Sequence, residues 1–391
     1  MFPTFGSYST PLTILYLWGL LFTLLLLWRY FRQKNISDLF LAGVLFVHTY
    51  ERTIYTIGFL SWYDNFPNTK INYFLISTSF IFGPLVYFYV KSVTQTNFKF
   101  KRQDYWHFLP QALLTLGALG VYLYDSNQAG FWETQNGKLV STLSMQYINL
   151  FCDILGDISI AIYLFLAIQM ERRYRKKIRE LFSSLFSVEL GWLRNFLAIF
   201  TLLFLSDILL NEINDNIVKM GYKDFWWIHL AAGLSLIYLG IYGYFLDIKK
   251  LHDINIGAGA QTLARTDEQQ QLSTADLESQ KRLHQFMEAE KPYLNPSLTL
   301  AKLAEAFELN ANLLSQIINK GEGMNFNDFI NAYRVKEVQQ MIIAGKADQF
   351  TLLTLAYEAG FNSKATFNRT FKKFTQLSPS EFLKKATKKD A

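Results

Sequence analysis

The stretch LAYEAGFNSKATFNRTFKKF, residues 355–374, decides how the end of this chain folds. A short helical segment precedes Gly360, which supplies a tight turn, and the segment after the turn is rich in Lys, Arg and Asn. A short helix, a tight turn and a second helix with cationic and amide side chains form the arrangement that enters the DNA major groove. The stretch therefore predicts a helix-turn-helix.

The surrounding residues 276–388 show helical periodicity throughout and lack the alternating pattern of strands. Gly345 ends a long helix before the opening stretch, and the SPSE motif at 378–381 is a capping box with proline at the first helical position. After a first helix that Pro292 ends, the predicted helices span residues 300–307, 310–320, 326–344, 352–359 and 363–374.

These helices form a first hairpin over residues 300–318 and a second hairpin over residues 352–374, separated by the long helix. We call the second helix of each hairpin its recognition helix. If the long helix holds both hairpins rigidly, the two recognition helices lie about one DNA turn apart. A monomer could then contact two successive major-groove segments.

The first 250 residues have a different composition. Hydrophobic residues make up 51% of the 391-residue chain and aromatic residues 17%, and they concentrate in this part. A membrane-spanning helix needs about 20 mainly apolar residues. The sequence therefore predicts a bundle of seven transmembrane helices within domain 1–250. The apolar stretches are residues 12–28, 39–60, 73–93, 107–124, 147–170, 190–210 and 226–248.

Lys and Arg are unevenly distributed among the gaps between these stretches. The gaps after the first, third, fifth and seventh stretches are basic, and the others are poor in cations. By the positive-inside rule the N-terminus lies outside and the C-terminus lies in the cytoplasm. The most basic gap, ERRYRKKIRE at residues 171–180, is interpreted as setting this topology and contacting lipid headgroups.

Several ionisable side chains interrupt the apolar stretches, where charges are costly and usually face a protein interior. With the predicted orientation they fall in the outer half of the bundle. They predict a pocket for an external ligand, or a proton sensor. The alternative is structural, with Arg52 paired to Glu51 or to an aspartate. The candidate pocket residues are Glu51, Arg52, Asp153, Asp157, Asp207 and His229.

No motif for a metal, a cofactor or enzymatic chemistry is apparent. His48 and His229 lack a ligand spacing such as H-E-x-x-H, so a metal site is the weaker interpretation. No Gly-rich phosphate loop or nucleophile elbow appears. A histidine kinase is not indicated, because no nucleotide-binding glycine boxes follow residues 251–275. The single cysteine, Cys152, excludes an intrachain disulfide. We expect neither an enzyme nor a cofactor.

Residues 251–275 join the two parts and are rich in Gly, Gln, Thr and Ser, with little apolar periodicity. They predict a flexible linker. A coil of this length spans only about 25–30 Å on average, so the domain at 276–391 is expected to stay close to the membrane.

The layout of about the last 110 residues resembles the DNA-binding domain of the AraC/XylS family of bacterial transcription regulators. The family's pattern of Gly-Phe, then Phe-x-Arg-x-Phe-Lys, then Thr-Pro or Ser-Pro and an aromatic is similar to this chain's second hairpin. The first hairpin fits the family's Leu-Ala and Leu-Ser run. Gln376 stands where the family often has Gly, and Leu383 replaces a frequent Arg. The matching residues are Gly360, Phe361, Phe367, Arg369, Phe371, Lys372, Ser378, Pro379 and Phe382, and Leu303, Ala304, Leu309, Leu314 and Ser315.

The resemblance implies double-stranded promoter DNA as a partner. Asn and Gln can pair with adenine and Arg with guanine, while Lys contacts phosphates that position the protein. Phe361, Phe367 and Phe371 have the spacing of hairpin core. The implied DNA-binding residues are Asn312, Ser315, Gln316, Asn319 and Lys320 in the first hairpin, and Ser363, Lys364, Asn368, Arg369, Lys372 and Lys373 in the second.

The sequence thus predicts an all-α protein in which a membrane domain senses an unknown signal and a cytoplasmic domain binds promoter DNA. The expected location is the bacterial inner membrane, with multiple passes. The net charge of +6 suits both anionic partners, lipid and nucleic acid. A homodimer fits this function, although no heptad run precedes the domain. Alternatives are a transporter, receptor or intramembrane enzyme with a regulatory appendage, or a protein-binding domain that has lost DNA binding.

Overall fold

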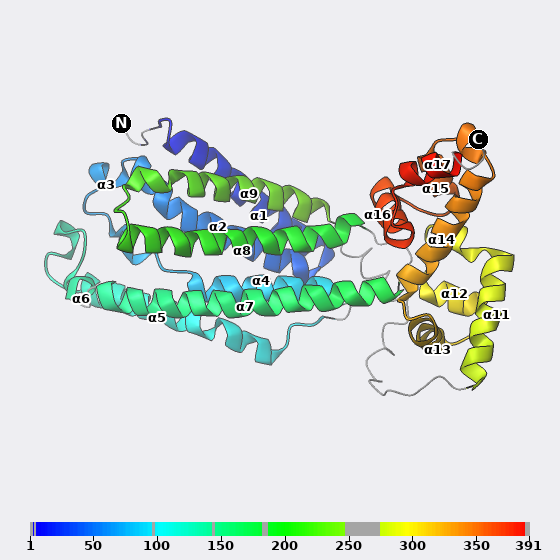
Figure 1. The fold of residues 1–391 in the computed structure, drawn as a ribbon. Helices are drawn as coiled ribbons and strands as arrows, with labels where there is room; N and C mark the ends of the chain where they lie inside the picture. The colour runs from blue at the N-terminus through cyan, green and yellow to red at the C-terminus, as the bar shows by residue number, and fades with distance from the viewer. Residues whose placement is uncertain are drawn as a thin grey trace. The chain divides into compact units, whose positions relative to one another are not determined.

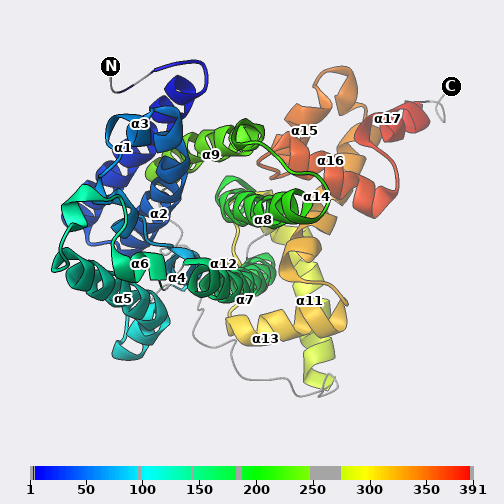
Figure 2. The same ribbon diagram turned by 90° about the vertical axis from the view of Figure 1, so that its left-hand side faces the viewer.

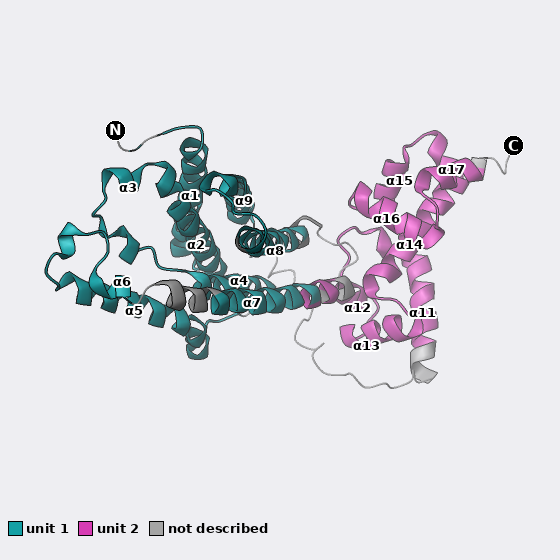
Figure 3. Cartoon of the chain, turned by 60° about the vertical axis from the view of Figure 1, so that its left-hand side comes forward, with its two compact units in different colours: residues 1–172, 191–248 teal, residues 173–190, 249–391 magenta. Residues whose placement is uncertain are grey.

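The computed structural model describes residues 3, 5–95, 98–142, 145–181, 187–246 and 274–387. Every regular element among them is a helix and none is a strand, which confirms the all-α prediction (Figure 1). The predicted linker lies outside these residues except for its last two positions. The chain forms two compact units, one of Met1–Arg172 with Gly191–Ile248 and one of Arg173–Leu190 with Lys249–Ala391 (Figure 3).

Long helices that run side by side build the first unit, and α7 and α8 are seen end-on in Figure 2. Each of the seven predicted apolar stretches overlaps one long helix. The long helices are α1 (Ser9–Gln33), α2 (Ile36–Phe59), α4 (Ser79–Thr94), α5 (Leu109–Ser126), α7 (Met145–Leu181), α8 (Ser187–Asn216) and α9 (Trp226–Phe245). The short ones are α3 (Trp62–Asn65), α6 (Lys138–Thr142), η1 (Lys70–Tyr73), η2 (Arg102–Phe108), η3 (Phe131–Glu133) and η4 (Tyr222–Phe225).

Four helices among the described residues, rather than the predicted seven, are long and apolar enough to cross a membrane. The other three fall short for visible reasons. Helix α2 carries Asp38, His48, Glu51 and Arg52, and α4 has only 16 residues. Helix α5 is long enough with 18 residues but is less apolar, since it includes Gln111 and Asp125. The four candidate spans are Ser9–Gln33, Ile154–Lys176, Gly191–Asn214 and Tyr222–Phe245.

Helix α4 begins later than predicted because residues 75–78 before it form no regular structure. The Tyr50 hydroxyl donates to the Phe74 carbonyl at 2.6 Å and accepts the Ile76 N–H at 2.9 Å. A side chain from α2 therefore satisfies backbone groups that a helix would have used.

Helix α2 lies at the centre of the first unit, where it packs against α1, α4 and α9. Many of its apolar and small residues are buried, Val44 and Leu45 among them, whereas many large apolar side chains of the surrounding helices are exposed. Leu24 of α1, Phe165 of α7 and Leu202 of α8 are 64%, 60% and 68% exposed. An apolar surface of this extent marks a face that another apolar phase or partner covers.

The second unit consists of the two hairpins and their supporting helices. Its elements are α11 (Thr274–Glu290), η5 (Pro292–Leu294), α12 (Leu300–Ala306), α13 (Ala311–Gln316), η6 (Ile317–Gly321), α14 (Phe326–Ile343), η7 (Lys346–Asp348), α15 (Leu352–Glu358), α16 (Lys364–Thr375) and α17 (Pro379–Thr387). The predicted helix over 310–320 is divided, because α13 continues as the wider π-type turn η6.

Local capping explains where these helices begin. A side-chain oxygen accepts an N–H of the first helical turn at five starts, which satisfies a donor that has no partner within the helix. The predicted capping box is present, since Ser378 N–H donates to Glu381 and Glu381 N–H donates to Ser378 Oγ. Hydrogen bonds to its carboxylate from the Ser378 hydroxyl and the Ser378 N–H hold the pKa of Glu381 below its usual value. The five capping residues are Thr299, Asn310, Asn325, Thr351 and Ser363.

Each hairpin has its own apolar cluster, and α14 contributes to both. Phe329 and Ile330 belong to the first cluster, with α11, α12 and α13, while Val338 belongs to the second, with α15 and α16. Tyr174 and Ile178, from the end of α7 that belongs to this unit, are buried in the first cluster.

The two hairpins meet at the backbone of η5. Arg334 of α14 is 1% exposed and donates its Nε–H to the Tyr293 carbonyl at 2.7 Å and an Nη2–H to the Asn295 carbonyl at 2.8 Å. Burial lowers the pKa of Arg334 to about 10. Gly360, the turn of the second hairpin, lies against the same carbonyl, since a Cβ on it would be 2.4 Å from Tyr293 O.

Gly360 is expected to tolerate no side chain. It has φ +91°, where an alanine costs about 1–2 kcal/mol, and the contact with Tyr293 O adds a steric term. Gly323 has φ +65° and open space around it, so Gly323→Ala carries the conformational cost alone. We expect Gly360→Ala to lower the free energy of opening of α14 and α16 by about 3 kcal/mol or more, and Gly323→Ala to cost about 1 kcal/mol. Native-state hydrogen exchange of the full chain measures both; equal effects would contradict the packing at Gly360.

Candidate nucleic-acid interface and polar cavity

The second recognition helix, α16, has one buried and one exposed face. Phe367 and Phe371 are 2% and 0% exposed and pack in the second cluster, as predicted for hairpin core. The opposite face exposes a guanidinium, an amide and two ammonium groups, which suit base edges and phosphates. The exposed side chains are Lys364, Ala365, Asn368, Arg369 and Lys372.

Two predicted residues of this hairpin have structural partners. Ser363 is half-buried and its Oγ accepts the Thr366 N–H at 3.2 Å, so it caps α16. Lys373 Nζ lies 2.7 Å from Asp328 Oδ1 on α14. Because this ion pair offsets the charge of Lys373, Lys372 is the better placed of the two lysines for a phosphate.

The first recognition helix presents Gln316, Asn319 and Lys320 on its exposed face, with Asn312 half-buried. The prediction that Ser315 belongs to this face is wrong. Ser315 is 6% exposed, and its Oγ accepts the Asn319 Nδ2–H at 3.2 Å. It is buried because it lies on the same side of the helix as Leu314 and Ile318, which fill the first cluster.

Leu313 was missed by the sequence analysis and is 36% exposed on this helix. It precedes Gln316 by three residues, so the two side chains share a face. A leucine there can contact a thymine methyl group, as apolar side chains do in the major groove. The spacing from Gln316 could have identified it, but its apolar character pointed to the core.

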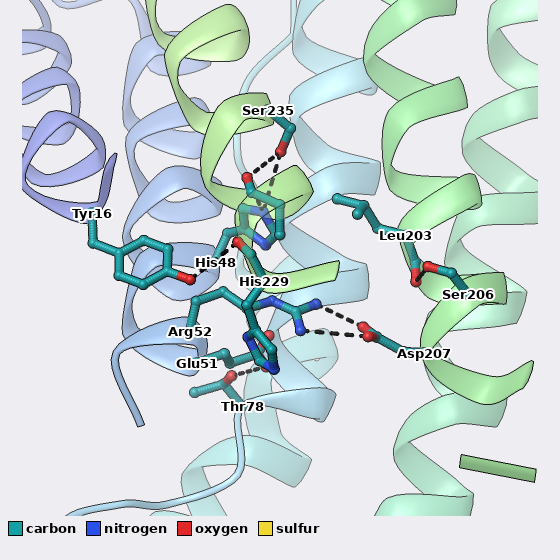
Figure 4. A network of polar contacts seen from close by, with 11 residues as sticks. Tyr16, His48, Glu51, Arg52, Thr78, Leu203, Ser206, Asp207, His229 and Ser235 are labelled. Atoms are coloured by element: carbon teal, nitrogen blue, oxygen red, sulfur yellow. Dashed lines mark hydrogen bonds and ion pairs between the residues drawn. The ribbon is translucent and has the colours of Figure 1, made fainter. Parts of the chain in front are cut away.

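The first unit contains a polar cavity of about 360 Å³ where the ends of several helices meet (Figure 4). Three of its lining residues are apolar and the others are polar or charged. The cavity is lined by Arg52 of α2, Ser79 of α4, Asp157 of α7, Leu210, Asn211 and Asp207 of α8, Phe225 of η4, and Ile228 and His229 of α9.

Arg52 and Asp207 form the ion pair of the cavity, with 2.6 Å between Nη2 and Oδ2. The structural alternative considered for Arg52, pairing with an aspartate, is therefore present, and Asp207 is that aspartate. Glu51 points to α4, where its carboxylate accepts a hydrogen bond from the Thr78 hydroxyl (Figure 4). The His229 ring stacks on Tyr55 with 3.6 Å between centroids.

Four of the six predicted pocket residues, Arg52, Asp157, Asp207 and His229, line this cavity. Glu51 is adjacent in sequence to Arg52 but is not among the lining residues. The side chain of Asp153 lies outside the part of the chain that the structure describes. Asn211 and Ser79 went unnoticed because polar residues at the ends of apolar stretches are common and carry no motif.

Two buried polar atoms of the cavity residues have no hydrogen-bond partner, Arg52 Nε and His229 Nδ1. The other histidine of these helices, His48, is 2% exposed and lies 3.4 Å from the Ala232 carbonyl through Nε2. Among the described residues no group of three or more His, Cys, Asp or Glu side chains could hold a metal ion.

The second unit, with its two hairpins and exposed recognition helices, has the architecture of a DNA-binding helix-turn-helix domain. Residues 303–385 match the protein family described as "Helix-turn-helix domain". The chain thus carries an AraC-type helix-turn-helix domain toward its C-terminus.

Two curated relatives are similar to this part. The chain is 27% identical over 112 residues to the uncharacterized HTH-type transcriptional regulator YijO and 31% identical over 88 residues to the melibiose operon regulatory protein, both of Escherichia coli (strain K12). These segments cover 28% and 22% of this chain, and 38% and 28% of the relatives. Both relatives are described as regulatory proteins, and one of them as an HTH-type transcriptional regulator.

A solved chain from Listeria innocua, described as a protein of unknown function, is also similar. It is 27% identical, with 27% of this chain and 93% of that chain covered and a TM-score of 0.23.

Arg369 and Lys372 are expected to differ in their effect on DNA binding, although both are exposed cations of α16. Arg369→Ala should cost about 1–3 kcal/mol at one base position and relax specificity there. Lys372→Ala should weaken binding to all DNA sequences alike, and it should reduce the slope of log affinity against log salt concentration by about 1. Binding titrations of the full chain, on sites selected from random DNA and their single-base variants, measure both. If Arg369→Ala lowered the affinity for all DNA sequences equally, recognition of a base by Arg369 would be contradicted.

Proposed function

We propose that this protein is a membrane-embedded one-component transcription regulator. Its first unit lies in the bacterial inner membrane and senses a signal, and its AraC-type domain binds promoter DNA in the cytoplasm. The observation that supports this most is that one chain combines an exposed pair of recognition helices with a helical unit whose outward faces are apolar.

The apolar outward faces support membrane embedding. Exposure of side chains such as Leu24, Phe165 and Leu202 is unfavourable in water and favourable in lipid. The three long helices outside the set of candidate spans fit the same bundle. Helix α2 is central, and its charged residues Asp38 and Arg52 are buried and paired with Arg29 and Asp207. Charged side chains within membrane helices usually face the interior of the bundle and pair with one another.

The distribution of Lys and Arg supports a C-terminus in the cytoplasm. With that orientation, α2 and α8 end, and α4, α7 and α9 begin, at the outer side. The cavity residues come from those helix ends, so the cavity opens toward the outside. A signal molecule could reach it without crossing the membrane.

Helix α7 contributes residues to both units. It is continuous over 37 residues, about 55 Å, which exceeds the roughly 30 Å of a bilayer core. Asp157 of α7 lines the cavity, while Tyr174 and Ile178 are buried in the apolar cluster of the first hairpin. Pairing of two copies on a promoter is compatible with this arrangement.

The proposed orientation predicts which segments a membrane-impermeant thiol reagent reaches in intact cells. In a Cys152→Ala background, Asn136→Cys, near the start of α6, should be labelled, and Gln33→Cys, at the end of α1, should be labelled only after permeabilisation. Both side chains are exposed, so accessibility within the protein does not decide the result. Labelling of both in intact cells, or of Gln33→Cys alone, would contradict the orientation.

The regulatory function predicts that the full-length protein occupies a limited set of promoters in cells. Chromatin immunoprecipitation should recover them with the intact chain, and the Asn368→Ala, Arg369→Ala variant should lose them while it remains in the membrane fraction. Cleavage of the linker should alter transcription from the same promoters. Recovery of random DNA by the intact chain would count against sequence-specific regulation.

A further inference from the structure

We propose that His284 of α11 is a positioning residue for DNA recognition, which sets the orientation of the first recognition helix through Glu322. This role rests on the proposed DNA binding of the second unit. Three hydrogen bonds carry it, and they join the end of that recognition helix, α11 and α14 to one another.

Glu322 directly follows the first recognition helix. Its backbone N–H donates to the Ile318 carbonyl at 3.0 Å, so Glu322 moves with the last turn of that helix. Its carboxylate oxygen Oε1 accepts Nε2–H of Gln280 at 2.6 Å and Nε2–H of His284 at 2.7 Å. A Cβ on Gly321 would lie 2.9 Å from Cδ of Gln280, so α11 lies directly against this turn. Two donors from α11 therefore hold the end of the helix.

His284 makes directional contacts through both ring nitrogens. Because a carboxylate only accepts hydrogen bonds, Nε2 donates to Glu322, and in the neutral ring Nδ1 accepts the hydroxyl proton of Tyr333. Burial raises the pKa of Tyr333, so that hydroxyl keeps its proton. The Tyr333 ring is itself held by packing, stacked on Tyr293 with 5.4 Å between centroids and edge-on to Phe329. His284 is thus fixed against α14 while it holds Glu322.

The last turn of the first recognition helix is the π-type turn η6, a rare conformation that occurs mostly as single turns, often at functional sites. Ile317 and Ile318 of this turn are buried in the first cluster, but burial of apolar surface is non-directional. Hydrogen bonds to Glu322 supply the direction that fixes the rotation of the helix about its axis. The same rotation sets where the exposed Gln316 and Asn319 point.

A purely structural role for His284 would give a different result. Its side chain is 41% exposed, so its removal is expected to leave most of the domain folded. If the residue served stability alone, removing it would lower the folded fraction and weaken binding to all DNA sequences alike. If it positions the helix, discrimination changes only at the bases that the first hairpin contacts.

The test measures base discrimination by the full-length protein on sites selected from random DNA. Gln316→Ala and Arg369→Ala first identify the base positions that belong to the first and the second hairpin. His284→Ala should then lower discrimination at the first set about tenfold, the order of one good bidentate contact, and leave the second set unchanged. The ratio of affinities for two sites does not depend on the folded fraction. Equal loss at both sets, or no loss at the first, would overturn the proposal.

Two further variants serve as controls. His284→Gln retains an N–H donor for Glu322, so it should restore most of the discrimination. Glu288→Gln removes a carboxylate of the same helix that is 65% exposed and paired with Lys336, and it should have no effect. If either variant behaved like His284→Ala, positioning through Glu322 would be contradicted.

Hydrogen exchange without DNA tests the tie directly. In His284→Ala the amides of residues 317–322 should exchange faster while those of α16 keep their protection, and unchanged exchange at 317–322 would overturn the proposal. Absence of sequence-specific binding by the parent would sink the regulator, and with it the role of His284 in recognition. Specific binding by the parent with unchanged discrimination in His284→Ala would remove only the role of His284.

Discussion

The buried guanidinium of Arg334 fixes the geometry on which the DNA-binding unit depends. It lies in α14 and donates to the carbonyls of Tyr293 and Asn295, so the η5 segment is held against the long helix. The Tyr293 carbonyl also borders Gly360, the turn of the second hairpin. A buried charge keeps its place only while its partners do, because losing one leaves it desolvated and unpaired. The segment between α11 and α12 is thereby tied to both halves of the unit.

Because both apolar clusters also share α14, the two recognition helices are presented by one continuous support. Their chemistry differs. Helix α16 exposes cations and an amide together, while the first recognition helix exposes Leu313 and Gln316 beside a single cation, Lys320. Electrostatic attraction to phosphates is therefore concentrated in the second hairpin. In the proposed complex with DNA, the first would contribute contacts whose value depends on base identity, such as a thymine methyl or an adenine edge.

In the first unit, buried charged side chains of α2 are held in ion pairs with other helices. Arg29 pairs with Asp38 at 2.5 Å and also donates to the carbonyls of Gly243 and Tyr244, which joins α1, α2 and α9. Arg52 and Asp207 join α2 to α8. Each pair offsets the desolvation of its charges. The first joins the consecutive helices α1 and α2, whereas the second joins α2 to the distant α8 and also lines the polar cavity.

The sequence by itself determined the elements whose causes are local. Caps at Thr299, Asn310 and Ser363, the Gly360 turn and the spacing of Phe367 and Phe371 all follow from hydrogen bonds or periodicity within a few residues. The same periodicity located the apolar stretches, and the rarity of charges within them identified Arg52, Asp157, Asp207 and His229.

Only the tertiary structure decided which side chains are buried, and with what they pair. Arg52 and Asp207 are 155 residues apart, and no spacing rule relates them. Ser315 was expected to face DNA but packs inward with Leu314, and Lys373 was expected at phosphates but pairs with Asp328 of another helix. The physical reason is common to all three: helical periodicity defines the faces of one helix, whereas burial and ion pairing depend on the neighbour that covers each face.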